Sequence, residues 1–167
     1  MVEALVRDTL QPALLDRLTD DDPARKTESR QERVISRSQL RACVLRDLSW
    51  LFNTTNLADD AELAAYPHVA ASVVNYGLAP LSGRIVSSVD LGTLERFLRE
   101  ALLRFEPRIL RGTLTVRGIP PTEPLGHHNV VSFEIAGEMW AQPYSLALLL
   151  KTDVDLESGE VRIADAG

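Results

Sequence analysis

The sequence predicts an α+β fold in which N-terminal helices precede a small antiparallel sheet of about four strands. Three observations predict it. Before Pro107 the apolar residues recur at helical spacing, and after it they alternate with polar residues. Helices followed by strands, rather than alternating with them, favour an α+β arrangement. The length of 167 residues, with 45% hydrophobic and 25% charged residues, is typical of one soluble domain.

The composition excludes several classes of protein. A net charge of -6 lacks the cationic surface of general nucleic-acid binders, so we expect no nucleic-acid partner. The single cysteine, Cys43, argues against a disulfide-stabilised secreted scaffold. No segment reaches the ~18 consecutive apolar residues of a membrane span, and the start does not resemble a signal peptide. We therefore expect a cytoplasmic protein without direct membrane insertion. We also expect the chain to be a monomer when isolated.

The first segment, residues 1–22, is expected to be an arm outside the core. A short amphipathic piece within it ends in the acidic run Asp20 to Asp22, which Pro23 follows. Proline and adjacent like charges break helices and are typical of a linker. We therefore place a single α+β domain at residues 23–167.

A first long helix is expected from Ala24 to about Phe52. Apolar residues in its second half follow one helix face, and Ser38 is a candidate N-cap for that half. The polar run at residues 53–56 favours local side-chain bonds over a continued helix.

A second helix is predicted from Pro67 to Tyr76, because proline suits a first helical position. Val69, Val73 and Tyr76 would form its buried face. Gly77 would follow as the residue just beyond the helix end.

The clearest helix runs from Asp90 to Phe105. Asp90 is a good N-cap, and apolar residues spaced by three or four form one continuous stripe. Pro107 ends the helix because its ring clashes with the preceding turn. We expect this helix to cover one face of the sheet.

Beyond Pro107 the apolar residues follow the period of β-strands. Short strands are expected around residues 113–118, 131–136, 146–150 and 161–163. The third is apolar on both faces, which indicates a central strand. A turn at residues 157–160 leads to the last strand, and the stretch 118–128, rich in proline and glycine, is expected to be a loop.

The sequence has no motif that indicates catalysis or a metal site. It contains no phosphate-binding glycine loop, no dinucleotide pattern, no G-x-S-x-G and no H-E-x-x-H. His127 and His128 are adjacent, so their side chains would diverge, and Cys43 lies on an apolar helix face. Glu134 and Glu138 are interpreted as exposed charges rather than an acid–base pair. We expect no catalytic residue, no metal and no cofactor.

A basic stripe runs along the first predicted helix at spacings of four, three, four and four: Lys26, Arg30, Arg33, Arg37 and Arg41. The stripe is either a solvated helix face or a docking face for an acidic protein partner. It carries no aromatic residue, which makes nucleic acid the poorer partner.

Two further features are unusual for an ordinary helix end or turn. Glu106 and Arg108 flank Pro107 at a helix end, either as a local ion pair or as a charged corner that pairs with another subunit. Met139 and Trp140 lie in a predicted turn, where they either fold back onto the sheet or form an interface loop.

Several segments carry a family-specific pattern, in the same order along the chain: residues 14–18, 44–51 with 53–54, 66–67 with 72–77, 104–109, 138–143 and 155–161. The most specific is Arg-Phe-Glu-Pro-Arg-Ile at residues 104–109. Together they resemble the lysozyme-like baseplate wedge family of contractile phage tails, and within it the TssE subunits of type VI secretion systems.

The resemblance implies a structural, non-enzymatic subunit of the baseplate wedge, which lies with TssF, TssG and TssK beneath the contractile sheath. The sheet is expected to be extended strand by strand by the first ring of TssB and TssC, so that it seeds the sheath. The family's Glu-Pro-Arg motif falls on Glu106, Pro107 and Arg108 and is expected to bind the wedge. The implied location is the cytoplasmic baseplate, docked on the inner-membrane complex.

Two other functions are compatible with parts of the sequence to different degrees. The chain could be a cytoplasmic adaptor that binds an acidic protein through the basic stripe. A peptidoglycan muramidase is a poor alternative, because the phage lysozyme pattern places Asp or Cys nine positions after a glutamate. None of the twelve glutamates here meets that spacing.

Overall fold

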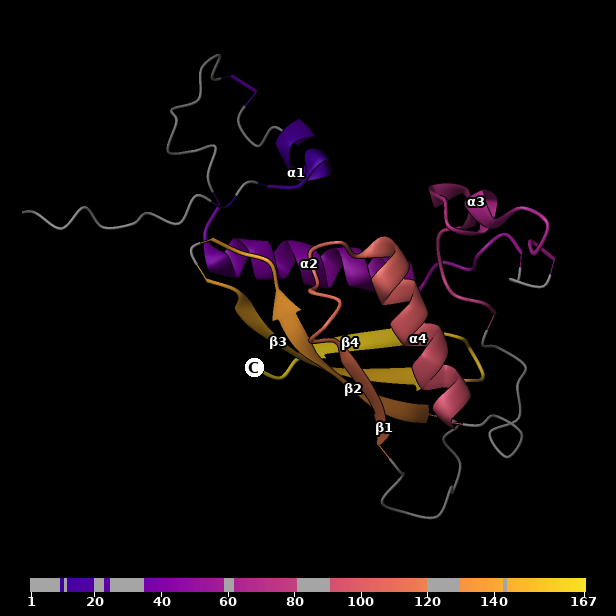
Figure 1. Cartoon of the computed structure of the whole chain (residues 1–167). Helices are drawn as coiled ribbons and strands as arrows, with labels where there is room; N and C mark the ends of the chain where they lie inside the picture. The colour runs from indigo at the N-terminus through magenta and orange to yellow at the C-terminus, as the bar shows by residue number, and fades with distance from the viewer. Residues whose placement is uncertain are drawn as a thin grey trace, which may run out of the picture.

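The computed structural model describes the chain at residue 10 and over residues 12–19, 23–24, 35–58, 62–80, 91–119, 130–142 and 144–167. Helices come first and strands last, and the strands form one antiparallel four-stranded sheet (Figure 1). The predicted α+β fold is therefore confirmed. No helix in these ranges is long and apolar enough to cross a membrane.

Among the described residues of the N-terminal segment, Leu10 alone is buried in the core. Leu10 is 3% exposed, and its carbonyl oxygen accepts a hydrogen bond of 3.0 Å from the Ile35 N–H. The short helix α1 (Leu14–Leu18) buries none of its residues, and Leu14 and Leu18 are 70% and 73% exposed. The division into an arm at residues 1–22 and a domain at 23–167 stays a prediction.

Helix α2 (Arg37–Phe52) forms the second half of the first predicted helix, and residues 25–34 lie outside the described residues. Its N-cap is Ser36 rather than Ser38. The Ser36 hydroxyl accepts from the Gln39 N–H at 3.2 Å, and the Gln39 side chain accepts from the Ser36 N–H at 2.8 Å. This reciprocal pair needs a Glu or Gln three residues after the cap, and Gln39 stands there only for Ser36.

The helix predicted from Pro67 to Tyr76 is instead two short pieces, α3 (Pro67–Ala70) and the 3-10 helix η1 (Val73–Asn75). The Ser72 hydroxyl separates them, because it donates to the Val69 carbonyl at 2.9 Å and accepts from the Val74 N–H at 3.3 Å. The predicted buried face is wrong at Val73, which is 81% exposed, and at Val69, which is 37% exposed.

Gly77 follows these pieces with φ of 123°, a conformation that favours glycine. It allows the next residue, Leu78, to pair with the segment after α2. The Leu78 N–H donates to the Thr54 carbonyl at 2.8 Å, and the Asn56 N–H donates to the Leu78 carbonyl at 2.9 Å.

Helix α4 (Leu91–Phe105) matches the clearest prediction at its C-terminal end, whereas the proposed cap, Asp90, lies outside the described residues. Its apolar stripe is buried: Leu94, Leu98, Ala101 and Leu102. The helix stops before Pro107, as expected, and the Arg111 side chain donates to the exposed end carbonyl of Leu103 at 2.9 Å.

The sheet contains β1 (Thr115–Ile119), β2 (Val130–Met139), β3 (Leu146–Asp155) and β4 (Val161–Asp165), in the order β1-β2-β3-β4. The third strand is central, as predicted. The turn before β4 is also confirmed, with Gly159 at φ of 78°.

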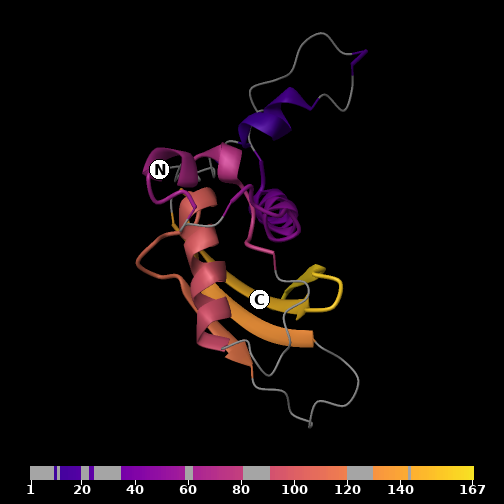
Figure 2. The same cartoon turned by 90° about the vertical axis from the view of Figure 1, so that its right-hand side faces the viewer.

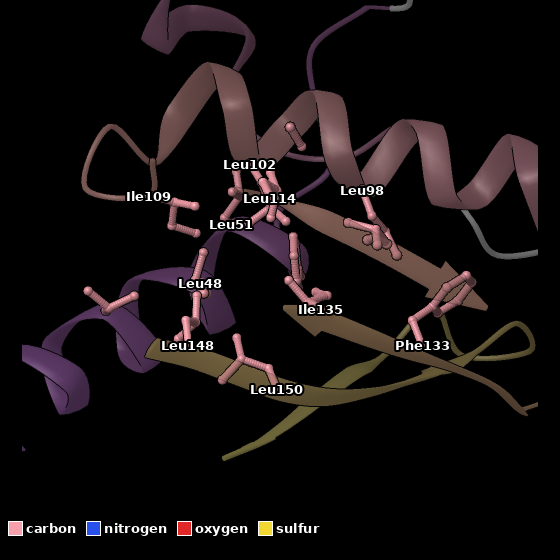
Figure 3. Close-up of a cluster of buried hydrophobic side chains, with 14 of the residues drawn as sticks. Leu48, Leu51, Leu98, Leu102, Ile109, Leu114, Phe133, Ile135, Leu148 and Leu150 are labelled. Atoms are coloured by element: carbon pink, nitrogen blue, oxygen red, sulfur yellow. The ribbon is translucent and has the colours of Figure 1, made fainter. Parts of the chain in front are cut away.

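One face of the sheet packs against both long helices (Figures 1 and 2). Helix α4 contacts β1 and α2 contacts β4. Alternate side chains such as Phe133, Ile135 and Leu150 are fully buried on this face, whereas Glu134 and Lys151 on the other face are exposed. Figure 3 shows Leu48 and Leu51 of α2 and Leu98 and Leu102 of α4 meeting the strand side chains in one core.

Candidate functional site

The corner that follows α4 is built by an ion pair within the Glu-Pro-Arg motif. The Arg108 Nε donates to Glu106 Oε1 at 2.7 Å, and Arg108 Nη2 donates to Glu106 Oε2 at 2.5 Å. Glu106 Oε1 also accepts from the Arg108 backbone N–H at 3.0 Å. Glu106 is only 4% exposed, so a buried carboxylate at the negative end of a helix is neutralised by the arginine two residues later.

This ion pair is one end of a longer chain of charges. Arg108 Nη2 also donates to Asp47 Oδ2 on α2 at 2.6 Å. The other oxygen of Asp47 accepts from Arg46 Nη2 at 2.8 Å, and Arg46 Nη1 donates to Asp16 of α1 at 2.6 Å. We call these residues the charged corner cluster: Asp16, Arg46, Asp47, Glu106 and Arg108.

Contacts within the cluster shift the pKa of three of its members, Asp16, Arg46 and Arg108, toward the charged form. The hydrogen bond from Arg46 lowers the pKa of Asp16, and the same hydrogen bond raises the pKa of Arg46. Burial acts to lower the pKa of Arg108, but Glu106 and Asp47 outweigh it and raise that pKa above its ordinary value. The cluster is therefore a network of ion pairs that joins α1, α2 and the end of α4.

Backbone hydrogen bonds fix the corner to the sheet. The Trp140 N–H donates to the Arg108 carbonyl at 2.7 Å, and the Leu110 N–H donates to the Glu138 carbonyl at 2.8 Å. These bonds flank an antiparallel bridge between Ile109 and Met139. The corner thus lies between α2 on one side and the end of β2 on the other.

Met139 and Trp140 differ in burial. Met139 is the last residue of β2 and is fully buried, so the expectation of an interface loop is corrected for it, because it packs in the core. Trp140 is 54% exposed beside the corner. Its role as an interface residue stays a prediction.

An aromatic pair covers part of the cluster. The rings of Tyr76 and Phe105 meet edge to face at 5.2 Å, and the Tyr76 hydroxyl donates to the Asp47 carbonyl at 3.4 Å. Burial, with the negative charges of Asp47 and Glu106, raises the pKa of Tyr76. Tyr76 is thereby tied to the backbone of α2 beside the cluster.

Two polar atoms of the cluster have no hydrogen-bond partner among the described residues: Arg108 Nη1 and Asp16 Oδ2, both buried. Buried polar groups normally have hydrogen-bond partners, so two unpaired atoms in one cluster are unusual. Pro107, by contrast, is exposed at the tip of the corner.

The predicted basic stripe is only partly described. Lys26, Arg30 and Arg33 lie outside the described residues, and Arg37 is exposed. Arg41 is not part of an open docking face, because its guanidinium forms an ion pair with Asp165 and donates to the Ala147 carbonyl at 2.8 Å. This internal use of Arg41 weakens the interpretation of the stripe as a site for an acidic partner.

The other residues considered for chemistry do not converge in the described ranges. Glu134 and Glu138 lie on the open face of the sheet, and Glu138 accepts from the Ser145 hydroxyl at 2.7 Å. Burial raises the pKa of the Cys43 thiol, with a smaller effect of Asp16. His127 and His128 lie outside the described residues, and no group of three His, Cys, Asp or Glu within them is placed to hold a metal ion.

Sequence reasoning missed Asp47, Arg46 and Asp16 as partners of the corner. A signal was available, because Arg46 and Asp47 are adjacent charges beside the buried residues Val44 and Leu48. Charged side chains next to a buried helix face are expected to have partners. Arg108, the partner of Asp47, is 61 residues away along the chain, and hydrophobic periodicity does not reveal such a pairing.

Comparison with known proteins gives two matches. A family model described as baseplate wedge protein gp25 matches residues 38–144, which contain every member of the charged corner cluster except Asp16. A chain in a solved structure titled "The baseplate complex from the type VI secretion system" has a TM-score of 0.50 and 22% sequence identity, covering 71% of this chain and 95% of that chain. At this identity the likeness supports the fold. No curated protein sequence matches.

Proposed function

The chain belongs to the baseplate wedge protein gp25 family, and from this membership we propose that it is a non-enzymatic, TssE-type subunit of a type VI secretion baseplate. In this role it joins the wedge subunits to the first ring of the contractile sheath and seeds sheath assembly. The match to a chain of a type VI secretion baseplate complex supports this choice among contractile machines. The location is then the cytoplasmic baseplate, docked on the inner-membrane complex.

The observation that carries the proposal is the charged corner cluster. A network of ion pairs between α2 and the end of α4, further bonded to the end of β2, holds the backbone of the corner in one shape. Such a corner presents the exposed Pro107 and the partly exposed edge of Arg108 at a fixed position. This suits a contact that must be preorganised for assembly.

The wedge partners in this proposal are TssF, TssG and TssK, and the sheath partners are TssB and TssC. Glu106 and Asp47 act by positioning Arg108, whereas Pro107 and Arg108 make the contact. The sheet supplies the second contact, because its outer strands carry peptide groups that another strand can pair with.

The proposal is tested by co-purifying the wedge with a variant that carries both Glu106→Ala and Arg108→Ala. We expect the variant to fold and its affinity for TssF and TssG to fall by about 30-fold or more, equivalent to about 2 kcal/mol, because the corner loses its shape and charge. The measurement is the fraction retained in the wedge over a concentration series, with circular dichroism to confirm folding.

A matched control removes another ion pair with the same charge change. Glu160 and Arg162 pair at 3.0 Å on the exposed surface near β4, so Glu160→Ala with Arg162→Ala leaves the corner intact. We expect this control variant to be retained in the wedge to the same fraction as the wild type. If the folded variant with Glu106→Ala and Arg108→Ala is retained in the wedge as well as the wild type, the corner does not contribute to wedge binding.

A further inference from the structure

Helix α1 turns its charged side toward the protein and its apolar side toward solvent. Asp16 accepts from Arg46 Nη1 of α2 at 2.6 Å, and its side chain is only 14% exposed. Leu14 and Leu18 are 70% and 73% exposed. Successive residues of an α-helix are rotated by about 100°, so the two leucines share one side and Asp16 lies on the opposite side. This is the reverse of an ordinary surface helix, which turns its leucines toward the core.

Burial of apolar side chains does not account for the position of α1. The helix has five residues, buries none of them and has no side-chain cap. A helix this short is not stable alone in water, so the ion pair at Asp16 is its main support. Figures 1 and 2 show α1 on the side of α2 that faces away from the sheet. A single exposed leucine needs no explanation, but two on one side of a helix whose charged residue points inward indicate a surface that another molecule covers.

Arg46 joins the leucines to a further exposed apolar residue, Trp50. The Arg46 guanidinium lies 5.0 Å from the centre of the Trp50 ring, one turn further along α2, and Trp50 is 50% exposed. The same guanidinium holds Asp16, so α1 and Trp50 are fixed beside one group. We call Leu14, Leu18 and Trp50 the outer apolar surface. Tryptophan is among the residues that most often contribute a large share of the binding energy in protein interfaces.

The outer apolar surface is continuous with the corner after α4. Asp47 accepts from Arg46 through one carboxylate oxygen at 2.8 Å and from Arg108 through the other at 2.6 Å. The position of α1 is therefore tied to that of the corner by a chain of ion pairs. The family model matches residues 38–144 and does not include α1. A contact made by α1 is thus additional to the role that membership of the family supports.

We propose that α1 is a docking element, and that the outer apolar surface packs on an apolar patch of the same wedge subunit that binds the corner. The inference rests on the proposed function, which supplies that subunit. Arg17 is exposed and lies next to the leucine side around the helix, so the patch carries an acidic residue at its border. The ion pairs hold α1 in place before the partner arrives, which reduces the entropy that binding costs.

The full chain with Leu14→Ala and Leu18→Ala tests the apolar contact. We expect its affinity for purified wedge subunits, measured over a concentration series, to fall by about tenfold or more. The thermal unfolding midpoint should not change, because neither leucine is buried. The matched control, Leu57→Ala with Val130→Ala, also shortens two exposed apolar side chains, and these belong neither to α1 or α2 nor to the corner. We expect the control to bind as the wild type does.

Asp16→Asn tests whether the ion pair positions the docking element. The amide keeps the size of the side chain but removes the charge that holds Arg46. We expect the affinity for the wedge subunits to fall by about threefold or more, and the loss to be smaller when both leucines are already alanine, because the two changes act on one contact. Full additivity of the two losses would show that Asp16 does not act through α1.

A photo-cross-linking amino acid in place of Leu18 identifies what covers the surface. In assembled baseplates we expect cross-links to a wedge subunit. Cross-links to a sheath subunit or to a second copy of this chain, or wild-type affinity of the leucine variant, would overturn the inference and leave the baseplate role standing. If the wild-type chain itself does not bind wedge subunits, the proposed function fails and the inference fails with it.

Discussion

Replacing Arg108 by alanine is expected to lower the free energy of unfolding by about 3–5 kcal/mol, because it leaves a buried carboxylate without its counter-charge. Glu106 is 4% exposed and takes three hydrogen bonds from Arg108, and Asp47 takes one more. The backbone bond survives the change, but the side-chain bonds do not. Urea denaturation of the wild type and the variant at neutral pH measures the loss.

The double variant with Glu106→Ala and Arg108→Ala is the informative control. Removing both charges takes away the unpaired carboxylate, so it should be more stable than Arg108→Ala alone, although it removes more atoms. Equal stability of the wild type and Arg108→Ala would show that the ion pair does not hold the corner, and the structural basis of the proposed wedge contact would be lost.

Replacing Gly77 by alanine is expected to cost about 3 kcal/mol or more, from an unfavourable φ and a backbone clash. Gly77 has φ of 123°, and a Cβ there would lie 2.2 Å from the Thr54 carbonyl oxygen. That oxygen accepts the bond from the Leu78 N–H, so the clash can be relieved only by separating the two segments. The thermal unfolding midpoint measures the effect.

Gly112 provides the matched control for this substitution. A Cβ at Gly112 would have nothing within 4 Å, so Gly112→Ala should change stability by less than about 0.5 kcal/mol. Similar midpoints for the two alanine variants would contradict the pairing of residues 54–56 with Leu78.

The parts of the fold that the sequence predicts well are those set by a repeating pattern. The stripe of α4 buries Leu94, Leu98 and Leu102, and the alternation in β2 buries Phe133 and Ile135. In both elements a single period determines which residues leave water, so the prediction needs no knowledge of distant partners.

The errors arise where local side-chain bonds compete with the pattern. Ser72 divides the helix that was predicted from Pro67 to Tyr76, and Gln39 selects Ser36 over Ser38 as the cap of α2. The bridge between Leu10 and Ile35, which buries Leu10, was likewise not visible in the pattern. Each outcome depends on one or two local hydrogen bonds, which hydrophobic periodicity does not predict.

The candidate site was predicted in part for the same reason. The Glu-Pro-Arg residues were identified because a glutamate at the C-terminal end of a helix, followed by proline, departs from the usual local preferences. The partner Asp47 was not, because it acts on a segment far along the chain. Only the folded arrangement brings these groups together.

As a structural baseplate subunit, this chain is proposed to be the base from which the sheath grows. The most direct measurement counts sheaths by electron microscopy after purified wedge and sheath subunits are mixed with or without this chain. The account predicts that sheaths extend from baseplates only when the chain is present, and that heat-unfolded chain does not substitute for it. Equal numbers of baseplate-attached sheaths with and without the chain would contradict the account.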